Sequence, residues 1–318
     1  MSSTTEQSST NLNFRRYLDG DISWKRWQDK IFDGDTSHQC PTYVQAAPPC
    51  QASCPAGEDI RSWLNIVRGI EKPPLGADGK PTMPWQEYAW RRLTECNPFP
   101  AIMGRVCPAP CQDGCNRAKV EDYVDINSVE QFLGNYALEK GLSFAKPEKE
   151  TGKRVAIIGG GVGGLACAYQ LRKKGHACVI FEDYSKLGGM LAFGLPSYRA
   201  DHAIVDIEVK RIIDMGVEVR LNTRVGRDVS FEDLKRDFDA IFIAIGAQKG
   251  NLLDIPGADA PNCIDGLEFL RDFNENKPTK FNQRVIVIGG GNTAMDVASV
   301  SLRTGTLNAQ GQRENAKV

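Results

Sequence analysis

Short apolar runs alternate with apolar positions at helical spacing from Arg154 to the end of the chain. The runs are rich in β-branched residues, and the alternation predicts the strand–helix–strand units of an α/β Rossmann-type fold. We expect strands at 155–158, 178–181, 217–221, 240–246 and 284–288, and helices at 165–171, 203–215, 231–237, 267–274 and 292–298. The run at 240–246 is apolar almost throughout, which predicts a buried strand.

The part of the chain before Arg154 has a helical pattern instead. Helices are expected at 59–68, 85–94 and 126–140, with a loop rich in proline and glycine at 71–84. A polar linker at 142–152 separates this part from the strands that follow. We therefore expect an N-terminal arm at 1–35, a helical domain at 36–150, the first part of a nucleotide-binding domain at 151–280, and the start of a second one at 281–318.

A glycine-dense turn joins the first expected strand to its helix. Gly159, Gly161 and Gly164 fit the pattern G-x-G-x-x-G, and Glu182 follows the next strand. In such a unit the glycines permit a tight turn, close approach of a pyrophosphate and close helix–strand packing. The acid stands near the spacing of about 20 residues at which a carboxylate meets ribose hydroxyls. The turn therefore predicts a dinucleotide site.

The same pattern returns at the fifth expected strand. Gly289, Gly291 and Ala294 fit G-x-G-x-x-A and predict a second dinucleotide site. The chain ends at Val318, before a second strand with a ribose-binding acid can follow. This domain is therefore expected to be incomplete. Either the chain is a fragment, which we favour, or another polypeptide completes the domain.

Composition and charge narrow the class of protein. The 318 residues are 41% hydrophobic and 25% charged, with a net charge of −1, so nothing favours a nucleic-acid partner. No apolar run reaches the length of a transmembrane helix. The first ten residues are polar and do not resemble a signal peptide, so a cytoplasmic location is expected.

Seven of the ten cysteines lie between Cys40 and Cys115. In a reducing compartment such a block predicts metal binding before disulfides. Three of these cysteines precede a proline, and the spacings are irregular, which favours iron–sulfur clusters over the paired cysteines of zinc sites. Zinc and unmetallated thiols are the alternatives.

The cysteine motifs and the two turns together resemble a known family. Cys50-x3-Cys54-Pro-Ala-Gly-x-Asp-Ile, Asn97-Pro-Phe-Pro and Gly104-Arg-Val-Cys-Pro-Ala-Pro-Cys-x3-Cys115 are similar to the small (β) subunit of glutamate synthase and its relatives. These include the N-terminal part of dihydropyrimidine dehydrogenase and the large subunit of NADH-dependent ferredoxin:NADP oxidoreductase. The resemblance covers about residues 36–300. It implies an α-helical bis-[4Fe-4S] domain, an FAD domain and an inserted NAD(P)H domain.

The resemblance also implies the ligands of the two clusters. One cluster would take Cys54, Cys107, Cys111 and Glu130, with Gln131 as the alternative if the helix register differs. The other would take Cys50 and Cys115 together with Cys40 and Cys96. The family has a C-x2-C pair before the position of Cys50, whereas this chain has Cys40 alone, so these last two ligands are uncertain and Cys96 is alternatively a buried apolar thiol.

By the same resemblance the first turn holds FAD and the second holds the nicotinamide nucleotide. The residues implied for FAD are Gly159, Gly161, Val162, Gly163, Gly164, Glu182, Gly189, Leu191, Val225 and Gly246. Those implied for NAD(P)H are Gly289, Gly291, Asn292 and Thr293. The cofactors carry the chemistry, so no catalytic acid or base is nominated.

The leading hypothesis is a subunit or module that oxidises NAD(P)H through FAD and two [4Fe-4S] clusters. It would pass electrons to a partner protein, as in glutamate synthase or in systems linked to ferredoxin or sulfite reductase, and would belong to a hetero-oligomer. The alternative is a non-catalytic electron-transfer and assembly subunit whose truncated nicotinamide domain accepts no hydride. A zinc-bound scaffold is a third hypothesis.

Overall fold

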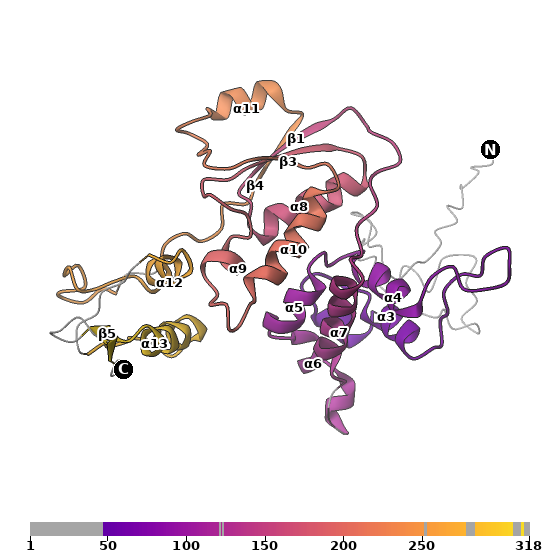
Figure 1. Ribbon diagram of the computed structural model, residues 1–318, viewed down its shortest axis with the longest axis horizontal. Coiled ribbons are helices and arrows are strands. Elements are labelled where there is room, and N and C mark those ends of the chain that lie inside the picture. Colours follow the sequence, from indigo (N-terminus) through magenta and orange to yellow (C-terminus); the bar gives the residue numbers. More distant parts are fainter. Residues whose placement is uncertain are drawn as a thin grey trace, which may run out of the picture. The chain divides into compact units, whose positions relative to one another are not determined.

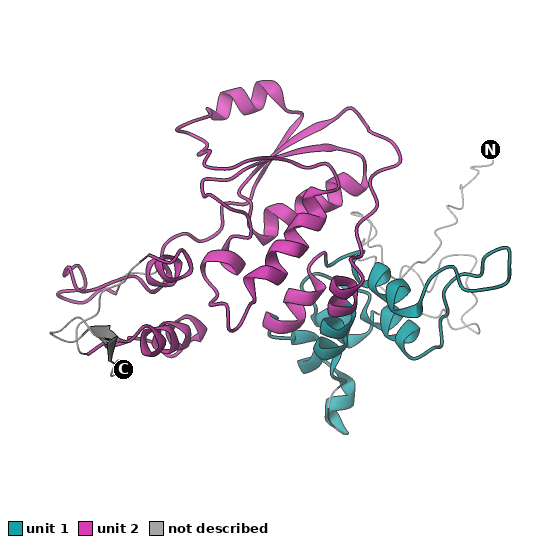
Figure 2. Ribbon diagram, in the orientation of Figure 1, with its two compact units in different colours: residues 1–97, 107–133 teal, residues 98–106, 134–318 magenta. Residues whose placement is uncertain are grey.

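The computed structural model describes residues 47–120, 122, 124–250, 253–277, 284–307 and 313–314. It divides into two compact units (Figure 2). Unit 1 comprises residues up to Asn97 and Cys107–Leu133, and unit 2 comprises Pro98–Val106 and Gly134 onward. The expected arm at 1–35 and Cys40 lie outside the described residues. The units do not follow the expected boundaries at 35, 150 and 280, and the four-part division stays a prediction.

Unit 1 is helical, as the pattern predicts. Its elements are α2 (Pro49–Ser53), α3 (Ile60–Val67), α4 (Trp85–Leu93), α6 (Pro110–Asp113), the 3-10 helix η1 (Asn116–Lys119) and the first part of α7 (Ile126–Glu139) (Figure 1). Helix α3 begins after Asp59, whose carboxylate accepts the backbone N–H of Ser62 and so caps the helix. Trp63, Leu93 and Leu133 lie in its apolar core. The short helices α2 and α6 were not expected.

Unit 2 is built on a parallel sheet in the order β3-β2-β1-β4 (Figure 1). The strands are β1 (Arg154–Ile158), β2 (Ala177–Phe181), β3 (Glu218–Arg220) and β4 (Ala240–Ile243), with a separate antiparallel pair, β5 (Thr306–Leu307) and β6 (Arg313–Glu314). The helices are α5 (Pro100–Val106), α8 (Val162–Lys173), α9 (Met190–Phe193), α10 (His202–Ile213), α11 (Phe231–Asp237), α12 (Gly266–Asn274) and α13 (Asn292–Thr304), together with the end of α7. The predicted helices thus form, and α5 and α9 were not expected.

Both faces of the sheet are covered. Successive side chains of a strand point to opposite faces, so Ile157 packs with α8 and α10 on one face while Ala156 packs with Leu234 of α11 on the other. Phe99, which precedes α5, and Ile102 in its first turn belong to the core on the first face. The carboxyl ends of β1 and β2 meet the glycine turn and Glu182, and this edge positions the first site.

Two strand predictions are wrong in detail. The expected buried strand at 240–246 ends at Ile243 and is an edge strand, with Phe242 and Ile243 exposed, because it pairs with β1 and with no other described strand. The segment 284–288 forms no strand, and Ile286 and Ile288 are exposed. Central strands need neighbours on both sides, and no paired strand flanks this segment among the described residues. None of the described helices has the length and apolar character needed to cross a membrane.

Candidate functional site

The first glycine turn lies between β1 and α8 and depends on two of its glycines. Gly159 has a positive φ of 106°, which favours glycine. A Cβ on Gly164 would lie 1.9 Å from the carbonyl oxygen of Gly159, so only glycine allows the helix to approach the turn. Helix α8 then begins at Val162 without a side-chain cap on its first turn. Uncapped N–H groups at a helix N-terminus suit an anionic phosphate group.

Glu182 closes this turn from the end of β2. The residue is buried, and its Oε2 accepts the backbone N–H of Gly160 at 2.6 Å while Oε1 accepts that of Tyr184 at 3.0 Å. The carboxylate is therefore fixed directly beside the glycine turn. This is the position that the sequence assigns to a ribose-binding acid.

The loop before α9 meets the glycine turn. Gly188 donates its backbone N–H to the carbonyl of Gly160, and a Cβ on Gly189 would lie 2.7 Å from the Cα of Gly161. A Cβ on Gly161 would in turn fill the space toward Gly189, which it would approach to 3.6 Å. Both glycines thus let two backbone loops lie in close contact with no side chain between them. Glycine at such a turn also lets the backbone approach a pyrophosphate. Leu191 is buried in α9.

Not every residue predicted to bind FAD lies in these two loops. Val225 forms an isolated bridge with Val229, and Gly246 lies in the loop after β4 with a φ of 65°. Gly163 is in the first turn of α8, where a Cβ would meet only the Ala244 Cβ, at 4.0 Å.

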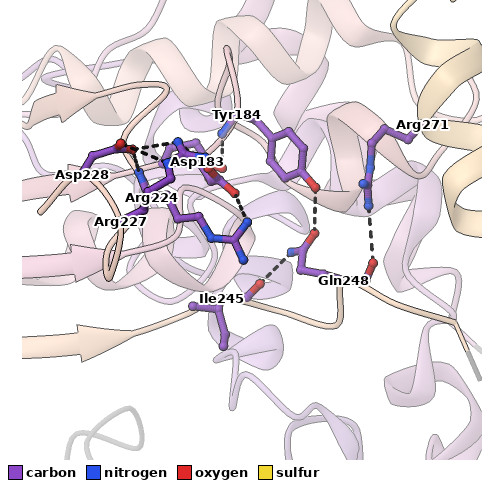
Figure 3. A network of polar contacts seen from close by, with 9 residues as sticks. Asp183, Tyr184, Arg224, Arg227, Asp228, Ile245, Gln248 and Arg271 are labelled. Carbon is purple, nitrogen blue, oxygen red and sulfur yellow. Dashed lines mark hydrogen bonds and ion pairs between the residues drawn. The ribbon is translucent and has the colours of Figure 1, made fainter. Parts of the chain in front are cut away.

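A polar network that the sequence did not predict includes Asp183 and Tyr184, which follow Glu182 in the chain (Figure 3). Asp183 pairs with Arg224 at 3.3 Å and with Arg227 at 3.7 Å. The Tyr184 hydroxyl donates to Gln248 at 3.4 Å, which ties the end of β2 to the loop after β4. Arg224 and Arg227 lie on either side of Val225, the residue predicted to lie near adenine. These two arginines were the feature of the sequence that could have indicated an ion pair with Asp183.

The second glycine turn precedes α13 and is more open than the first. Gly289 has a φ of 128°, and a Cβ on Gly291 would meet nothing within 4 Å. Asn292 and Thr293 form the first turn of α13. Val285, Val287 and Met295 line a shallow apolar groove here.

Helix α13 is joined to the loop after α9 by a buried acid. Asp296 accepts from Arg199 at 2.6 Å and from the Tyr198 hydroxyl at 3.3 Å, and the Arg303 guanidinium lies 3.8 Å from the centre of the Tyr198 ring. Burial raises the pKa of Tyr198, with Asp296 adding to the rise. This contact is not visible in the sequence.

Three thiols and one carboxylate are brought together in unit 1. Burial raises the pKa of Cys111 to about 12, and the neighbouring Cys54, Cys107 and Glu130 add to that rise. Burial also raises the pKa of Cys107, again with help from Glu130 and Cys54. Thiolates in such a group repel one another, and a cationic metal centre would stabilise them. Binding of the metal would therefore release the protons of the thiols.

The other described cysteines of unit 1 are Cys50, Cys96 and Cys115. Cys50 lies near Cys115, whose proximity adds to the burial that raises the pKa of Cys50. Backbone N–H groups, first that of Val124, lower the pKa of Cys115 and thus favour its thiolate. The Cys96 Sγ lies 3.9 Å from the carbonyl oxygen of Gly57 and is partly buried, so both roles predicted for Cys96, cluster ligand and packing thiol, stay predictions.

The donor set fits an iron–sulfur cluster. Thiolates are the ordinary cluster ligands, and a carboxylate is an acceptable ligand for iron. No group of three ligating side chains among the described residues closes around a single ion. A cluster is larger than one ion, so its ligands lie farther apart.

Comparisons with known proteins bear on both units. Residues 37–142 match the family model of dihydropyrimidine dehydrogenase domain II, 4Fe-4S cluster, and residues 153–309 match that of pyridine nucleotide-disulphide oxidoreductases. The chain is 36% identical to the glutamate synthase [NADPH] small chain of Bacillus subtilis, over 88% of this chain and 58% of that one. The chain belongs to the family of glutamate synthase small subunits and their relatives.

Other relatives in this family have different names. The chain is 34% identical to the NADPH-Fe(3+) oxidoreductase subunit beta of Geobacter sulfurreducens, over 81% of this chain and 37% of that one. It is 36% identical to the NADP(+)-dependent formate dehydrogenase subunit beta of Moorella thermoacetica, over 81% and 38%. The chain therefore spans between about a third and three fifths of the length of these relatives.

Family membership confirms the predicted fold class and the classes of cofactor, namely FAD, a nicotinamide nucleotide and [4Fe-4S] clusters. The individual binding residues remain predictions.

Three residues beside the thiols were not recognised in the sequence. Gly114 lets α6 approach α2, because a Cβ there would lie 2.0 Å from the Ser53 Oγ. Glu58 and Asn97 are buried, and both occur within motifs of the family. Asn97 begins the motif Asn-Pro-Phe-Pro, which could have indicated its importance. Glu58 occupies the position x of Cys-Pro-Ala-Gly-x-Asp-Ile, where the motif specifies no residue type.

Proposed function

We propose that this chain is an NAD(P)H-oxidising electron-transfer module that binds FAD at the first glycine turn and two [4Fe-4S] clusters in unit 1, and that it passes electrons to a partner protein. The observation that carries this proposal is the group of Cys54, Cys107, Cys111 and Glu130, in the same chain as a glycine turn closed by the buried Glu182. Bound FAD accepts a hydride from a nicotinamide and releases electrons one at a time.

The residues of unit 2 would hold and orient the flavin nucleotide. The first turn of α8 would face the pyrophosphate with its N–H groups, and Gly161 and Gly189 place no side chain in front of them. Glu182, already fixed by two backbone hydrogen bonds, would accept from the ribose hydroxyls.

The nicotinamide nucleotide would bind at Gly289, Gly291, Asn292 and Thr293, where the open turn places no side chain in the way. The Arg199–Asp296 pair supports this assignment because it fastens α13 to the loop after α9, and the loop before α9 meets the first glycine turn.

The acceptor is proposed to be a protein redox centre in a hetero-oligomer. The relatives include a small chain and two beta subunits. Their names contain Fe(3+), formate dehydrogenase and glutamate synthase, so modules of this kind occur with several electron acceptors and donors.

Anaerobic addition of NADPH or NADH to the FAD-loaded protein tests the proposal. Bleaching of the flavin absorption by either nucleotide is the expected result. A flavin that stays oxidised with both nucleotides would instead favour a non-catalytic electron-transfer and assembly subunit. The segment 284–288 favours this second candidate, because it forms no strand among the described residues and exposes Ile286 and Ile288.

Replacing Cys111 with serine is expected to remove one cluster and leave the other cluster and FAD in place. Cys54, Cys107 and Glu130 are the neighbours whose charges add to the burial that raises the pKa of Cys111. Iron content should fall by about half, measured beside the EPR spectrum of the reduced protein. Cys263→Ser, in an exposed loop, is the matched control. Loss of both clusters would contradict the assignment of ligands, and a protein that contains zinc and no iron would contradict the clusters themselves.

A further inference from the structure

A buried asparagine joins two buried acids next to the first group of thiols. Glu58, Asn97 and Glu130 are 7%, 8% and 6% exposed and come from the loop before α3, the segment after α4 and helix α7. The Asn97 Nδ2 donates to the Glu130 Oε1 at 2.5 Å, and the Asn97 side chain also hydrogen-bonds to Glu58. All three lie in unit 1.

The chemistry of this trio is specific. An asparagine amide has two N–H donors and a carboxylate only accepts, so one amide nitrogen can serve both acids. Burial raises the pKa of Glu58 to about 7, and the hydrogen bond from Asn97 opposes that rise. Two buried acids without a shared donor would be costly to keep side by side.

The trio adjoins the residues that would hold a cluster. Cys107 interacts electrostatically with both Glu130 and Glu58, while Cys111 interacts with Glu130. The last torsion of a glutamate side chain is broad, so a Glu130 carboxylate without a partner would have no fixed orientation. Hydrogen-bond partners of metal ligands orient the ligand and tune the metal centre.

We propose that Asn97 is a positioning residue for Glu130 as an oxygen ligand of the cluster held by Cys54, Cys107 and Cys111, and that Glu58 holds the Asn97 amide in place and sets the potential of that cluster through its charge. This inference rests on the proposed function. It assigns roles to two residues that do not contact the iron. An ionised Glu58 disfavours the arrival of an electron, because cluster potentials depend on nearby charge and hydrogen bonds.

The test uses the full chain with FAD and reconstituted clusters, studied by an EPR-monitored redox titration at about pH 9, above the pKa of Glu58. Asn97→Leu removes both donors. One cluster is expected to change its EPR signal and to lose iron at least about tenfold faster, as for other partners of metal ligands. The second cluster and the FAD content should stay as in the wild type.

The Glu58 variants separate the hydrogen bond from the charge. Glu58→Gln keeps an oxygen that accepts from Asn97 and removes the charge, so the EPR signal should be retained while the midpoint potential rises. A tenfold change in the reduction equilibrium corresponds to about 59 mV for one electron. Glu58→Leu removes the acceptor as well and is expected to resemble Asn97→Leu.

Thr94→Val is the matched control. Thr94 is a buried polar residue three positions before Asn97, and its hydroxyl donates to the backbone carbonyls of Trp90 and Arg91. Both cluster signals should survive this change. If Asn97→Leu does not fold, Asn97→Ser replaces it in the comparison with the wild type and Thr94→Val. Serine shortens the side chain and retains a polar group.

Two results would overturn the inference. The first is an unchanged signal and potential in the Asn97 variant when Glu130→Ala alters the cluster. The second is an equal loss of both clusters and FAD in Asn97→Ser, which would indicate a merely structural role. Absence of any [4Fe-4S] signal in the reconstituted wild-type chain would contradict the proposed function instead.

Discussion

Replacing Gly164 with alanine is expected to abolish retention of FAD by the purified protein. The new Cβ would lie 1.9 Å from the carbonyl oxygen of Gly159 and 3.1 Å from the Ile157 Cγ2. Both neighbours belong to the backbone turn or the sheet core, so neither can move without separating α8 from β1. Overpacking of this kind costs about 1–3 kcal/mol or more, and here it also displaces the helix N-terminus that would face the pyrophosphate.

Flavin content per chain and the thermal unfolding midpoint measure this effect. Gly290→Ala is the matched control, because a Cβ at Gly290 in the second turn would meet nothing within 4 Å. That variant should retain FAD as the wild type does. A Gly164→Ala protein with full FAD content and an unchanged unfolding midpoint would show that the turn is not the FAD site.

The sequence was sufficient for the elements whose signals are local. The strands β1 and β2 and helices α8, α10 and α11 appear close to where hydrophobic periodicity placed them, since each carries its own apolar face. Helices α2, α5 and α6 were missed because they are short and lie among Cys-Pro motifs that resemble loops. Their first residues, Pro49, Pro100 and Pro110, were the available signal, because proline is favoured in the first turn of a helix.

Features that depend on neighbours far along the chain were not predictable. An apolar run such as 240–246 indicates a strand, but its burial depends on which strands pair with it, and β4 has a described partner on one side alone. The contact of Asn97 with Glu130 likewise joins residues from different elements. One sequence names the chemical groups of the site, whereas only the fold shows which of them share hydrogen bonds.

In unit 2, a contact between residues far apart in the sequence joins Glu208 to the start of α5. Glu208 lies on α10 and is fully buried, and its two carboxylate oxygens accept the backbone N–H groups of Ala101 and Ile102 at 2.9 and 3.0 Å. Gly134 of α7 lets this end of α5 approach, since a Cβ there would lie 2.3 Å from the Ala101 nitrogen. One buried acid thus anchors a helix to the sheet domain.

Burial raises the pKa of Glu208 from 4.5 to about 7, and the two backbone hydrogen bonds and Arg211 oppose this rise. The folded state therefore binds a proton more tightly than the unfolded chain does. The stabilisation is fully present below about pH 4.5 and is lost as the pH rises through about 7. Over that window the free energy of unfolding is expected to fall by about 3 kcal/mol from this group, at 1.36 kcal/mol per pKa unit.

Glu208→Gln should remove the contribution of Glu208 to this pH dependence, while that of Glu58, whose pKa burial also raises to about 7, remains. The substitution should lower the stability at acidic pH most of all. The amide oxygen can accept one N–H, but the amide nitrogen would face the other and leave a buried donor unsatisfied, at a cost of about 1–3 kcal/mol. Urea unfolding at a series of pH values between about 5 and 8 measures both effects. Glu232→Gln, on the exposed surface of α11, should keep the wild-type slope. A Glu208→Gln protein that retained that slope would place the titration on a different group.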